Sequence, residues 1–322
     1  MKKLKLSIII TTRNRVSLLR NCICSIEKNN LGFLYEVIII DDASSDGTQE
    51  FDINEFPNLN IVLIQNPQQM MMVRSRNIGA RLAKGEFVLF IDDDNEIDAY
   101  MIENLIDHLD NNPDVGLVGP SMYHPGSKHP YLTSQKINLF TGKTTGIISV
   151  KEKCSSSDGI PNVFMIRKIA LEKNNYFDER IVQTFSEPDF AFAARDHSYK
   201  CEMILTAKTF HNKTWGHAGI QISNNNFRQK AYYIMRNRIL FIRRYGSIKH
   251  KIIFMPFFSW MWPTIYSLIA LRYFRFDLIA LYWLGYADGL KIILTGRIDS
   301  YNDSLDRVSR LLNKFSRKKI PG

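Results

Sequence analysis

The sequence predicts a doubly wound α/β fold, followed by a helical C-terminal region. Over the first 120 of its 322 residues, short and almost unbroken apolar runs alternate with helical patterns. Runs that are apolar on both faces are typical of parallel strands buried between two layers of helices. After residue 225 the chain instead carries long apolar stretches and many basic residues. We therefore predict two regions, residues 1–225 and residues 226–322, with a mostly parallel sheet flanked by helices in the first.

Each element of this fold has its own local signal. The expected strands are β-branched runs at Leu6–Ile10, Val37–Ile40, Ile61–Ile64, Phe87–Ile91 and Val115–Val118. Between them apolar residues recur at helical spacing, within Leu18–Ile26, Ile78–Ala83 and Met101–Leu109. Residues 121–159 lack either pattern, and we expect long loops or small antiparallel strands at the sheet edge. A further helix is expected to begin at Ser186, where Ser-Glu-Pro-Asp matches a capping box.

Composition excludes several classes of protein. With 45% hydrophobic and 23% charged residues the chain is neither collagen-like nor disordered. Its four cysteines are too few and too scattered for a disulfide scaffold or a zinc knuckle, and a reduced, cytosolic environment fits best. The apolar run near the N-terminus is short and no small-residue cleavage site follows it, so a signal peptide is not expected.

The basic charge of the chain is concentrated in one stretch. The formal net charge is +10, yet twelve basic residues and no acidic residue lie between Glu202 and Asp277. The positive charge of this stretch alone therefore exceeds the formal net charge of the whole chain. Such a region is typical of proteins that contact an anionic partner, such as nucleic acid, a phosphate-rich substrate or a membrane surface.

A long uncharged segment follows within the same region. Residues 252–271 contain no charge and are flanked by Lys251 and Arg272. Twenty such residues meet the length of a membrane span, but Pro256 and Pro263 interrupt the helix and its many aromatic residues prefer membrane interfaces. Interfacial or re-entrant helices, a true span and a buried helix pair all remain open. The basic flank favours an anionic membrane surface, and nucleic acid would leave the uncharged run unexplained.

Two acidic clusters come directly after predicted strands. Asp41 and Asp42 follow the second strand, and Asp92, Asp93 and Asp94 follow the fourth. Parallel strands share one carboxyl edge, where ligands of such sheets bind, so we expect both clusters at one site. Neighbouring carboxylates repel one another unless they are solvated or bind a cation, and oxygen ligands suit Mg²⁺ or Mn²⁺ with a diphosphate. The alternative is a pair of solvated loops in which an aspartate caps the next helix.

Phosphate-binding glycine loops are missing from the sequence. Neither G-x-G-x-x-G after the first strand nor G-x-x-x-x-G-K anywhere in the chain is found. This argues against a dinucleotide-binding dehydrogenase and against a P-loop enzyme. Phosphate would then be held by metal and side chains.

Four motifs in order resemble those of family 2 glycosyltransferases. They are SIIITTRNR at 7–15, VIIIDDASSDGT at 37–48, RNIG at 76–79 and FIDDD at 90–94. The resemblance covers about residues 5–215. It implies a GT-A fold and an inverting reaction that uses a nucleotide-sugar donor.

The resemblance also implies roles for individual residues. Those expected at the nucleotide are Thr11, Thr12, Arg13, Asp41, Asp42, Arg76, Asn77, Asp92 and Asp93. Asp92 and Asp94 stand at the family's D-x-D carboxylates and, with His211, are the expected ligands of Mg²⁺ or Mn²⁺. For Arg76 a solvated position on a helix is the alternative, and for His211 a structural role.

The general base has two candidates. The segment at 186–189 resembles the family's E-D-x-D motif, and Glu187 matches the position of the base. Asp189 would be the third residue of the helix if Ser186 is its N-cap, which is a structural position. Glu187 and Asp189 are thus the expected catalytic residues, with Glu187 preferred.

These observations together predict a glycosyltransferase. It would move a sugar from a UDP-, TDP- or GDP-sugar to a hydroxyl of a glycan or lipid-linked acceptor, in polysaccharide biosynthesis. We expect it at the cytoplasmic face of the membrane, peripheral or integral. One alternative is a sugar-phosphate nucleotidyltransferase, which the absence of glycine from residues 11–15 disfavours. Another is a non-catalytic module that binds a metal or another ligand.

Overall fold

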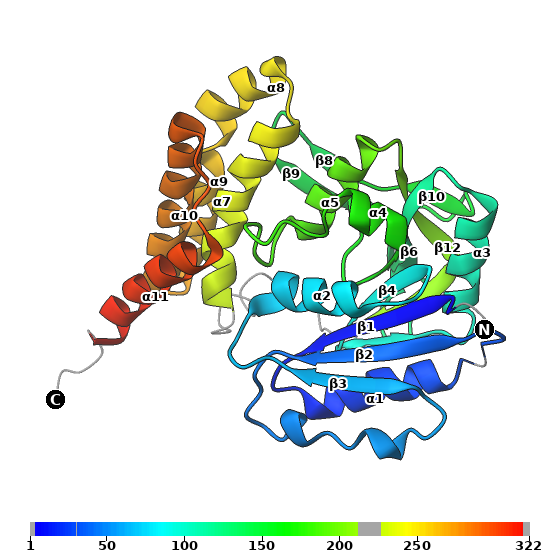
Figure 1. Cartoon of the computed structure of the whole chain (residues 1–322). Coiled ribbons are helices and arrows are strands. Elements are labelled where there is room, and N and C mark those ends of the chain that lie inside the picture. Colours follow the sequence, from blue (N-terminus) through cyan, green and yellow to red (C-terminus); the bar gives the residue numbers. More distant parts are fainter. Residues whose placement is uncertain (1–3, 30, 212–226, 318–322) are drawn as a thin grey trace. The chain divides into compact units, whose positions relative to one another are not determined.

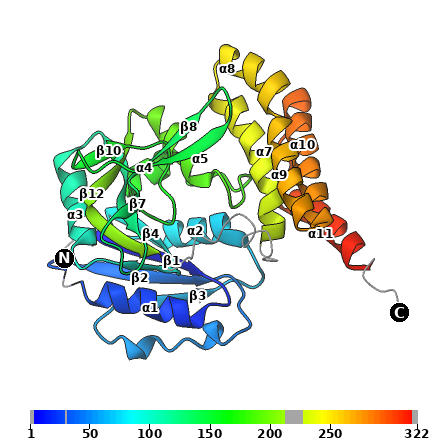
Figure 2. The same cartoon turned by 180° about the vertical axis from the view of Figure 1, so that it is seen from behind.

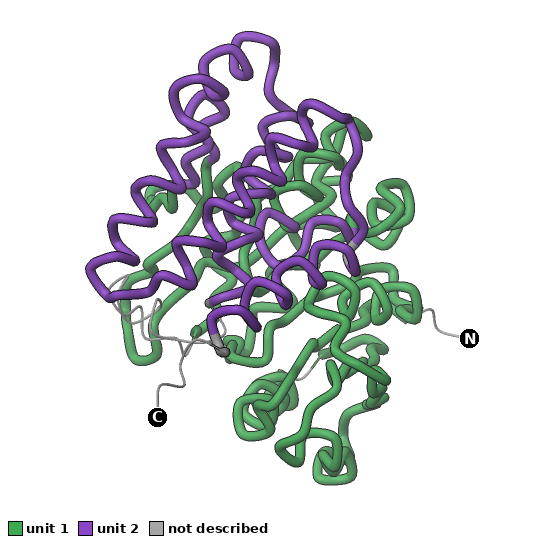
Figure 3. The backbone as a smooth tube through the Cα atoms, turned by 90° about the vertical axis from the view of Figure 1, so that its left-hand side faces the viewer, with its two compact units in different colours: residues 1–136, 145–178, 187–213 green, residues 137–144, 179–186, 214–322 purple. Residues whose placement is uncertain are grey.

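The computed structural model describes residues 4–29, 31–211 and 227–317 (Figure 1). The chain forms two compact units (Figure 3). The first, here called the α/β unit, comprises residues 1–136, 145–178 and 187–213; the second, the helical unit, comprises residues 137–144, 179–186 and 214–322. The helical unit thus includes two short segments from the middle of the sequence. The predicted boundary at 225/226 lies outside the described residues.

All five predicted strands are present in the α/β unit. They are β1 (Leu6–Thr12), β2 (Tyr35–Asp41), β3 (Ile61–Gln65), β4 (Phe87–Asp92) and β6 (Val115–Tyr123). They belong to a ten-stranded sheet whose main path runs β10-β12-β6-β11-β4-β1-β2-β3. β1 pairs in parallel with both β2 and β4, and β2 with β3.

The sheet is mixed because one antiparallel strand lies inside it. β11 (Val163–Arg167) pairs antiparallel with both β4 and β6, and β12 (Lys200–His211) lies parallel to β6. Short strands cover residues 121–159 as expected: β7 (Pro130–Leu132), β8 (Ser134–Asn138), β9 (Lys143–Ile147) and β10 (Cys154–Ser156). β8 and β9 form a separate hairpin, and β5 (Asn95–Ile97) pairs with β12.

Helices cover both faces of this sheet (Figures 1 and 2). α1 (Val16–Glu27) and α3 (Met101–Asn111) contribute to the core on one face, and α2 (Met71–Leu82), α4 (Lys168–Lys173) and α5 (Ser186–Arg195) to the core on the other. Ile8 and Ile10 face the first core, and Ile9 the second. Each such buried side chain contributes about 1.5–3 kcal/mol. Two one-turn helices, η1 (Thr48–Glu50) and η2 (Ile53–Glu55), connect β2 to β3.

A glycine sets how closely α2 approaches the sheet. A Cβ atom on Gly79 would lie 2.7 Å from the Cγ2 atom of Ile9 in β1. Only a residue without a side chain therefore allows α2 to pack at this depth. The consequence is that Arg76, one turn earlier on α2, is carried into the protein interior and is only 1% exposed.

The helical unit is built from consecutive helices. They are α7 (Phe227–Tyr245), α8 (Ile248–Ile253), the π-helical turn η3 (Phe254–Phe258), α9 (Met261–Arg272), α10 (Phe276–Thr295) and α11 (Tyr301–Arg317). α7 and α10 pack against each other so closely that a Cβ atom on Gly285 would lie 2.2 Å from the Tyr232 carbonyl oxygen. Their interface is therefore specified by backbone proximity as well as by apolar side chains.

The long uncharged segment is not one regular α-helix. It is divided by η3, which contains Pro256, and a proline cannot donate the hydrogen bond that a helix interior requires. Two stretches, Ile248–Arg272 and Phe276–Thr295, are nevertheless long and apolar enough to cross a membrane, with 17% and 39% of their most apolar windows buried. Few residues of the first stretch are therefore buried in the described chain.

Candidate active site

The strand register brings the two acidic clusters to one edge of the sheet. Thr12 at the end of β1 is opposite Asp41 in β2, and Thr11 is opposite Asp92 in β4. Since β1 lies between β2 and β4, the carboxyl ends of three parallel strands coincide. This is the arrangement that the sequence predicts.

Asp93 and Asp94 share one arginine. Arg15 Nη1 lies 2.8 Å from Asp93 Oδ1 and 3.3 Å from Asp94 Oδ2, and Thr12 Oγ1 donates a 2.7 Å hydrogen bond to Asp93. Burial raises the pKa of Asp93 to about 6 even though Arg15 and Thr12 oppose the shift. Arg15 therefore neutralises part of the repulsion within the cluster. Arg15 belongs to the motif at residues 7–15, but the family resemblance implied no role for it.

Arg76 joins the acidic cluster to the expected general base. Its Nη2 lies 2.7 Å from Asp92 Oδ1, and its Nη1 lies 2.6 Å from Glu187 Oε1. The guanidinium also lies over the ring of Phe164. Burial raises the pKa of Asp92, with Arg76 acting in the opposite direction. Because Arg76 is buried in this bridge, the solvated alternative for this residue is wrong.

His211, one of the expected metal ligands, lies against Asp94. Its Nε2 is 3.4 Å from Asp94 Oδ1, and its Nδ1 is 3.2 Å from the Tyr131 hydroxyl. Asn162 Nδ2 lies 3.5 Å from the same Nε2. His211 is 4% exposed, and Tyr131 orients the ring so that Nε2 faces the acidic cluster. Sequence reasoning missed Tyr131 and Asn162 because neither lies in a motif.

These donors fit a hard divalent cation. Two adjacent ligands of an octahedral ion at ~2.1 Å are about 3 Å apart, close to the separation of Asp94 and His211. Carboxylate oxygen and imidazole nitrogen are both ligands that Mn²⁺ accepts, and Mg²⁺ prefers the oxygens. Asp92, the third expected ligand, lies two residues before Asp94 and is paired with Arg76 at 2.7 Å.

Asp41 and Asp42 organise the loops around this edge. Asp42 is 6% exposed and accepts hydrogen bonds from the backbone N–H groups of Met70 and Met71, at 2.6 and 2.9 Å, at the start of α2. Asn66 and Ser75 side chains also donate to it. Asp41 accepts from the backbone N–H and the hydroxyl of Ser44. Asp42 thus caps the start of the next helix, α2, which is the structural role that the sequence left as the alternative to ligand binding.

The other residues expected at the nucleotide lie in different surroundings. Asn77 is fully buried, and its amide exchanges hydrogen bonds of 2.9 and 3.0 Å with the backbone of Phe177. Thr11 is half-buried at the end of β1, and Arg13 is exposed in the loop that follows. Asn77 therefore braces α2, whereas Thr11 and Arg13 lie at the edge where the acidic clusters meet.

The two base candidates lie in the first turn of α5. α5 begins at Ser186, as predicted, and includes both Glu187 and Asp189. Glu187 contacts Arg76, while Asp189 is buried with 6% of its surface exposed. The structure therefore brings Glu187, together with Arg76 and Asp92, into the group that contains Asp94 and His211.

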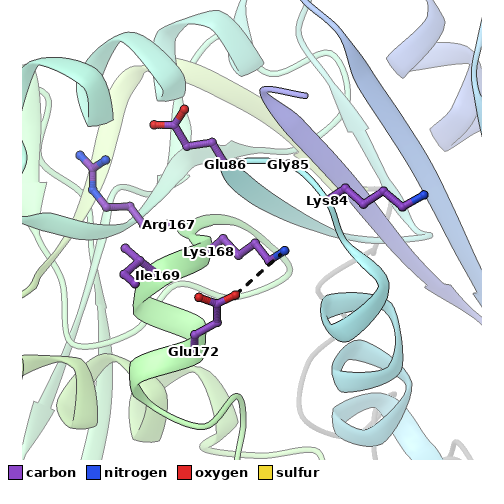
Figure 4. A pocket seen from close by; sticks show the side chains of 7 residues that line it. All are labelled: Lys84, Gly85, Glu86, Arg167, Lys168, Ile169 and Glu172. Atoms are coloured by element: carbon purple, nitrogen blue, oxygen red, sulfur yellow. Dashed lines mark ion pairs between the residues drawn. The ribbon is translucent and has the colours of Figure 1, made fainter. Parts of the chain in front are cut away.

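A pocket of about 280 Å³ opens at the opposite end of the strands (Figure 4). Its lining residues are Lys84, Gly85, Glu86, Arg167, Lys168, Ile169 and Glu172. They precede β4, end β11 or belong to α4, so they lie at the edge of the sheet away from Asp92. Lys168 donates to the Ala83 carbonyl oxygen at 2.7 Å and lies 4.0 Å from Glu172. The pocket is separate from the candidate active site.

Comparison with known sequences points to one family. Residues 7–174 match the family model described as Glycosyl transferase family 2. An uncharacterized glycosyltransferase of Haemophilus influenzae is 31% identical over 251 residues, which cover 73% of this chain and 77% of that protein. Chondroitin synthase of Escherichia coli is 33% identical over 129 residues, but the matched part is 39% of this chain and only 19% of that much longer protein.

Solved structures show the same fold. Residues 1–349 of S. aureus TarS, crystallised with UDP-GlcNAc, match with a TM-score of 0.55 at 20% identity, over 74% of this chain and 66% of that one. GalNAc-T7, crystallised with UDP, GalNAc and Mn²⁺, matches with a TM-score of 0.59 at 15% identity, over 77% of this chain and 54% of that one. The predicted GT-A fold, with its mixed sheet between helices, is thereby confirmed. The chain is a glycosyltransferase and belongs to glycosyl transferase family 2.

Proposed function

We propose that the protein is an inverting glycosyltransferase that transfers a sugar from a nucleoside-diphosphate sugar to a hydroxyl group. The observation that carries this proposal is the bridge formed by Arg76 between Asp92 and Glu187. Through this bridge Glu187, the carboxylate that would accept a proton, is linked to the acidic cluster in which Asp94 faces His211. Membership of the family sets aside the nucleotidyltransferase and the non-catalytic module.

Glu187 is the proposed general base. It would accept the proton of the acceptor hydroxyl while that oxygen forms a bond to the anomeric carbon. The bond from the anomeric carbon to the diphosphate breaks at the same time, and the diphosphate leaves with the electron pair. A single displacement of this kind inverts the anomeric configuration. Arg76 holds the Glu187 carboxylate in place for this step.

Asp92, Asp94 and His211 are the proposed ligands of Mg²⁺ or Mn²⁺. When bound, such an ion neutralises the charge that develops on the leaving diphosphate. The proposal is supported by the 3.4 Å separation of Asp94 and His211 and by the Mn²⁺ in the structure of GalNAc-T7. Arg15, already paired with Asp93 and Asp94, provides a further positive charge at this edge.

The proposed donor is a UDP-sugar, with TDP- and GDP-sugars as the alternatives. The structures of TarS and GalNAc-T7 both contain UDP or a UDP-sugar. Thr11, Thr12, Arg13, Asp41 and Asp42 surround the strand ends where the nucleotide would bind. The motif at residues 11–15 has no glycine loop for phosphate, so the metal and side chains would carry that contact.

A thermal-shift panel tests the donor and the metal together. We expect UDP with Mn²⁺ to raise the unfolding temperature, and a ligand at 100 times its Kd stabilises a protein by about 2.7 kcal/mol. GDP and TDP, each with and without Mn²⁺, are the comparisons. UDP should lose most of its effect when EDTA replaces Mn²⁺. A panel in which no nucleotide stabilises the protein, with or without metal, would contradict the proposed donor class.

We further propose that the helical unit binds an anionic membrane surface and that the acceptor is a lipid-linked or polysaccharide glycan. Ile252 and Phe257 are each 65% exposed, and Leu268 is 63% exposed. Lys249 and Lys251 accompany them on α8. Exposed apolar side chains beside basic residues suit the interface of an anionic bilayer. The proposed location is peripheral, at the cytoplasmic face.

Flotation with liposomes tests the membrane contact. The full chain should float with anionic vesicles, and less at high salt because salt screens the basic residues. Replacing Phe257 and Leu268 together by serine should reduce the floated fraction severalfold. Ile169→Ser is the matched control, because Ile169 is 50% exposed but belongs to the α/β unit. A full chain that stays in the aqueous fraction with every lipid would support soluble packing instead.

A further inference from the structure

The segment of residues 179–186 leads directly into Glu187 and has a strained backbone. Gln183 and Phe185 both have left-handed conformations, with φ of 63° and 67°. The Thr184 N–H donates a 2.8 Å hydrogen bond to the Val182 carbonyl oxygen across Gln183, which is the pattern of a γ-turn with positive φ. Such conformations are rare for residues other than glycine and persist only where the surrounding structure holds them.

Two adjacent residues of α7 hold this segment through its carbonyl groups. Asn237 Nδ2 donates to the carbonyl oxygens of Val182 and Thr184, at 3.0 and 2.9 Å. Arg236 Nη1 donates to the Arg180 carbonyl oxygen at 2.8 Å and to Asn237 Oδ1 at 3.1 Å. The contacts therefore reach every second carbonyl, at 180, 182 and 184, and the two side chains support each other.

The same segment is also anchored by apolar contacts with the helical unit. Ile181 is fully buried and packs with Leu240 of α7 and Ile292 of α10. The ring of Phe185 lies 5.4 Å from that of Phe241. Strained residues, buried hydrogen bonds and apolar packing thus coincide over eight residues.

Arg236 and Asn237 are a charged and a polar side chain buried where a helix interface usually carries apolar residues. Both are 0% exposed, and the Arg236 guanidinium donates hydrogen bonds to oxygens of Arg180, Asn237 and Asp299. Burying a charged group is costly unless it is well paired. An apolar pair would satisfy the helix packing but would leave the carbonyls at 180, 182 and 184 without these donors.

We propose that Arg236 and Asn237 are positioning residues for catalysis. They keep the backbone of residues 180–184, which directly precede Glu187 in the chain, in one strained conformation. A general base that is held in place retains the geometry that proton transfer requires. This inference rests on the proposed role of Glu187 as the base.

Substitution of Asn237 by alanine tests the inference. Asn237→Ala should lower kcat ten- to a hundredfold and leave the affinity for UDP with Mn²⁺ within about twofold, because no proposed nucleotide or metal ligand is touched. Tyr233→Phe is the matched control. Tyr233 also lies on α7, is fully buried, and its hydroxyl contacts Ser304 at 3.2 Å. The control should lose stability without a comparable loss of kcat.

A second variant guards against misfolding. Gln183→Gly places at position 183 a residue that adopts positive φ without strain, so the chain should still fold. The γ-turn should then be more mobile, and kcat should again fall while UDP affinity is retained. A kcat equal to that of the wild type in both Asn237→Ala and Gln183→Gly would overturn the inference.

A double-mutant cycle identifies the route of the effect. If Asn237 acts through Glu187, the variant with both Asn237→Ala and Glu187→Gln should be no slower than Glu187→Gln alone. If the two losses of kcat instead multiply in the double variant, Asn237 acts independently of Glu187. That result would overturn the inference while the proposed base stands. Wild-type turnover by Glu187→Gln alone would instead overturn the proposed base, and this inference with it.

Discussion

Glu187→Gln is expected to lower kcat by a factor of at least a hundred while UDP still binds. The amide keeps the size of the side chain but cannot accept the proton of the acceptor hydroxyl, and general base catalysis typically contributes 10²–10⁴-fold. Arg76 retains its ion pair with Asp92 in this variant, so the fold should survive. The measurement is single-turnover transfer from a UDP-sugar, with UDP affinity determined separately.

Asp189→Asn is the control for this prediction. Asp189 lies two residues further along α5 and is 6% exposed. Its loss should cost about 0.5–2 kcal/mol of stability, as for a residue that supports the start of a helix, with little change in kcat. The opposite pattern, an active Glu187→Gln and a folded but inactive Asp189→Asn, would assign the base to Asp189.

Asp94→Asn is expected to abolish turnover and the metal dependence of UDP binding. The substitution keeps the shape of the side chain but removes the charge that faces His211 at 3.4 Å. Without the ion, charge on the leaving diphosphate is not neutralised, and a loss of about a thousandfold corresponds to about 4 kcal/mol of transition-state stabilisation. The measurements are turnover and UDP affinity, each with Mn²⁺ and with EDTA.

A surface aspartate is the matched control for this second prediction. Asp110→Asn removes an exposed carboxylate whose partner is Lys5 at 3.0 Å, and surface ion pairs contribute about 1 kcal/mol or less. It should leave turnover and its dependence on Mn²⁺ unchanged. Turnover by Asp94→Asn at the wild-type rate, or an undiminished rate of the wild type in EDTA, would exclude the proposed metal role.

Several features of the site could be predicted because they follow from local patterns. The five apolar runs are strands, and the acidic clusters lie at their carboxyl ends. Parallel pairing of β1 with β2 and β4 then brings Asp41 and Asp92 to one edge whatever the loops do. The strand β11 was not predicted, since its direction depends on a long connection and not on its five residues.

The roles of individual charged residues could not be predicted in the same way. Asp42 follows a strand and Arg76 belongs to a helix. The sequence around each is compatible with a solvent-exposed side chain as well as with a buried one. The structure buries Arg76 between Asp92 and Glu187, and it directs Asp42 to the start of α2. Arg76 reaches that depth because Gly79 lets α2 pack closely on Ile9. Such contacts depend on packing between segments far apart in the chain.

The sequence by itself determined the α/β elements, the edge at which the carboxylates gather and the motifs of the family. Periodicity, β-branching and strand direction act over a few residues, so they can be recognised locally. Only the tertiary structure decided which charged and polar side chains contact one another. Arg76 contacts Glu187, Asp94 faces His211, and Asn237 holds the carbonyls of Val182 and Thr184. These partners are distant in sequence, and a buried charge or amide selects the one neighbour that the packed chain brings within hydrogen-bond distance.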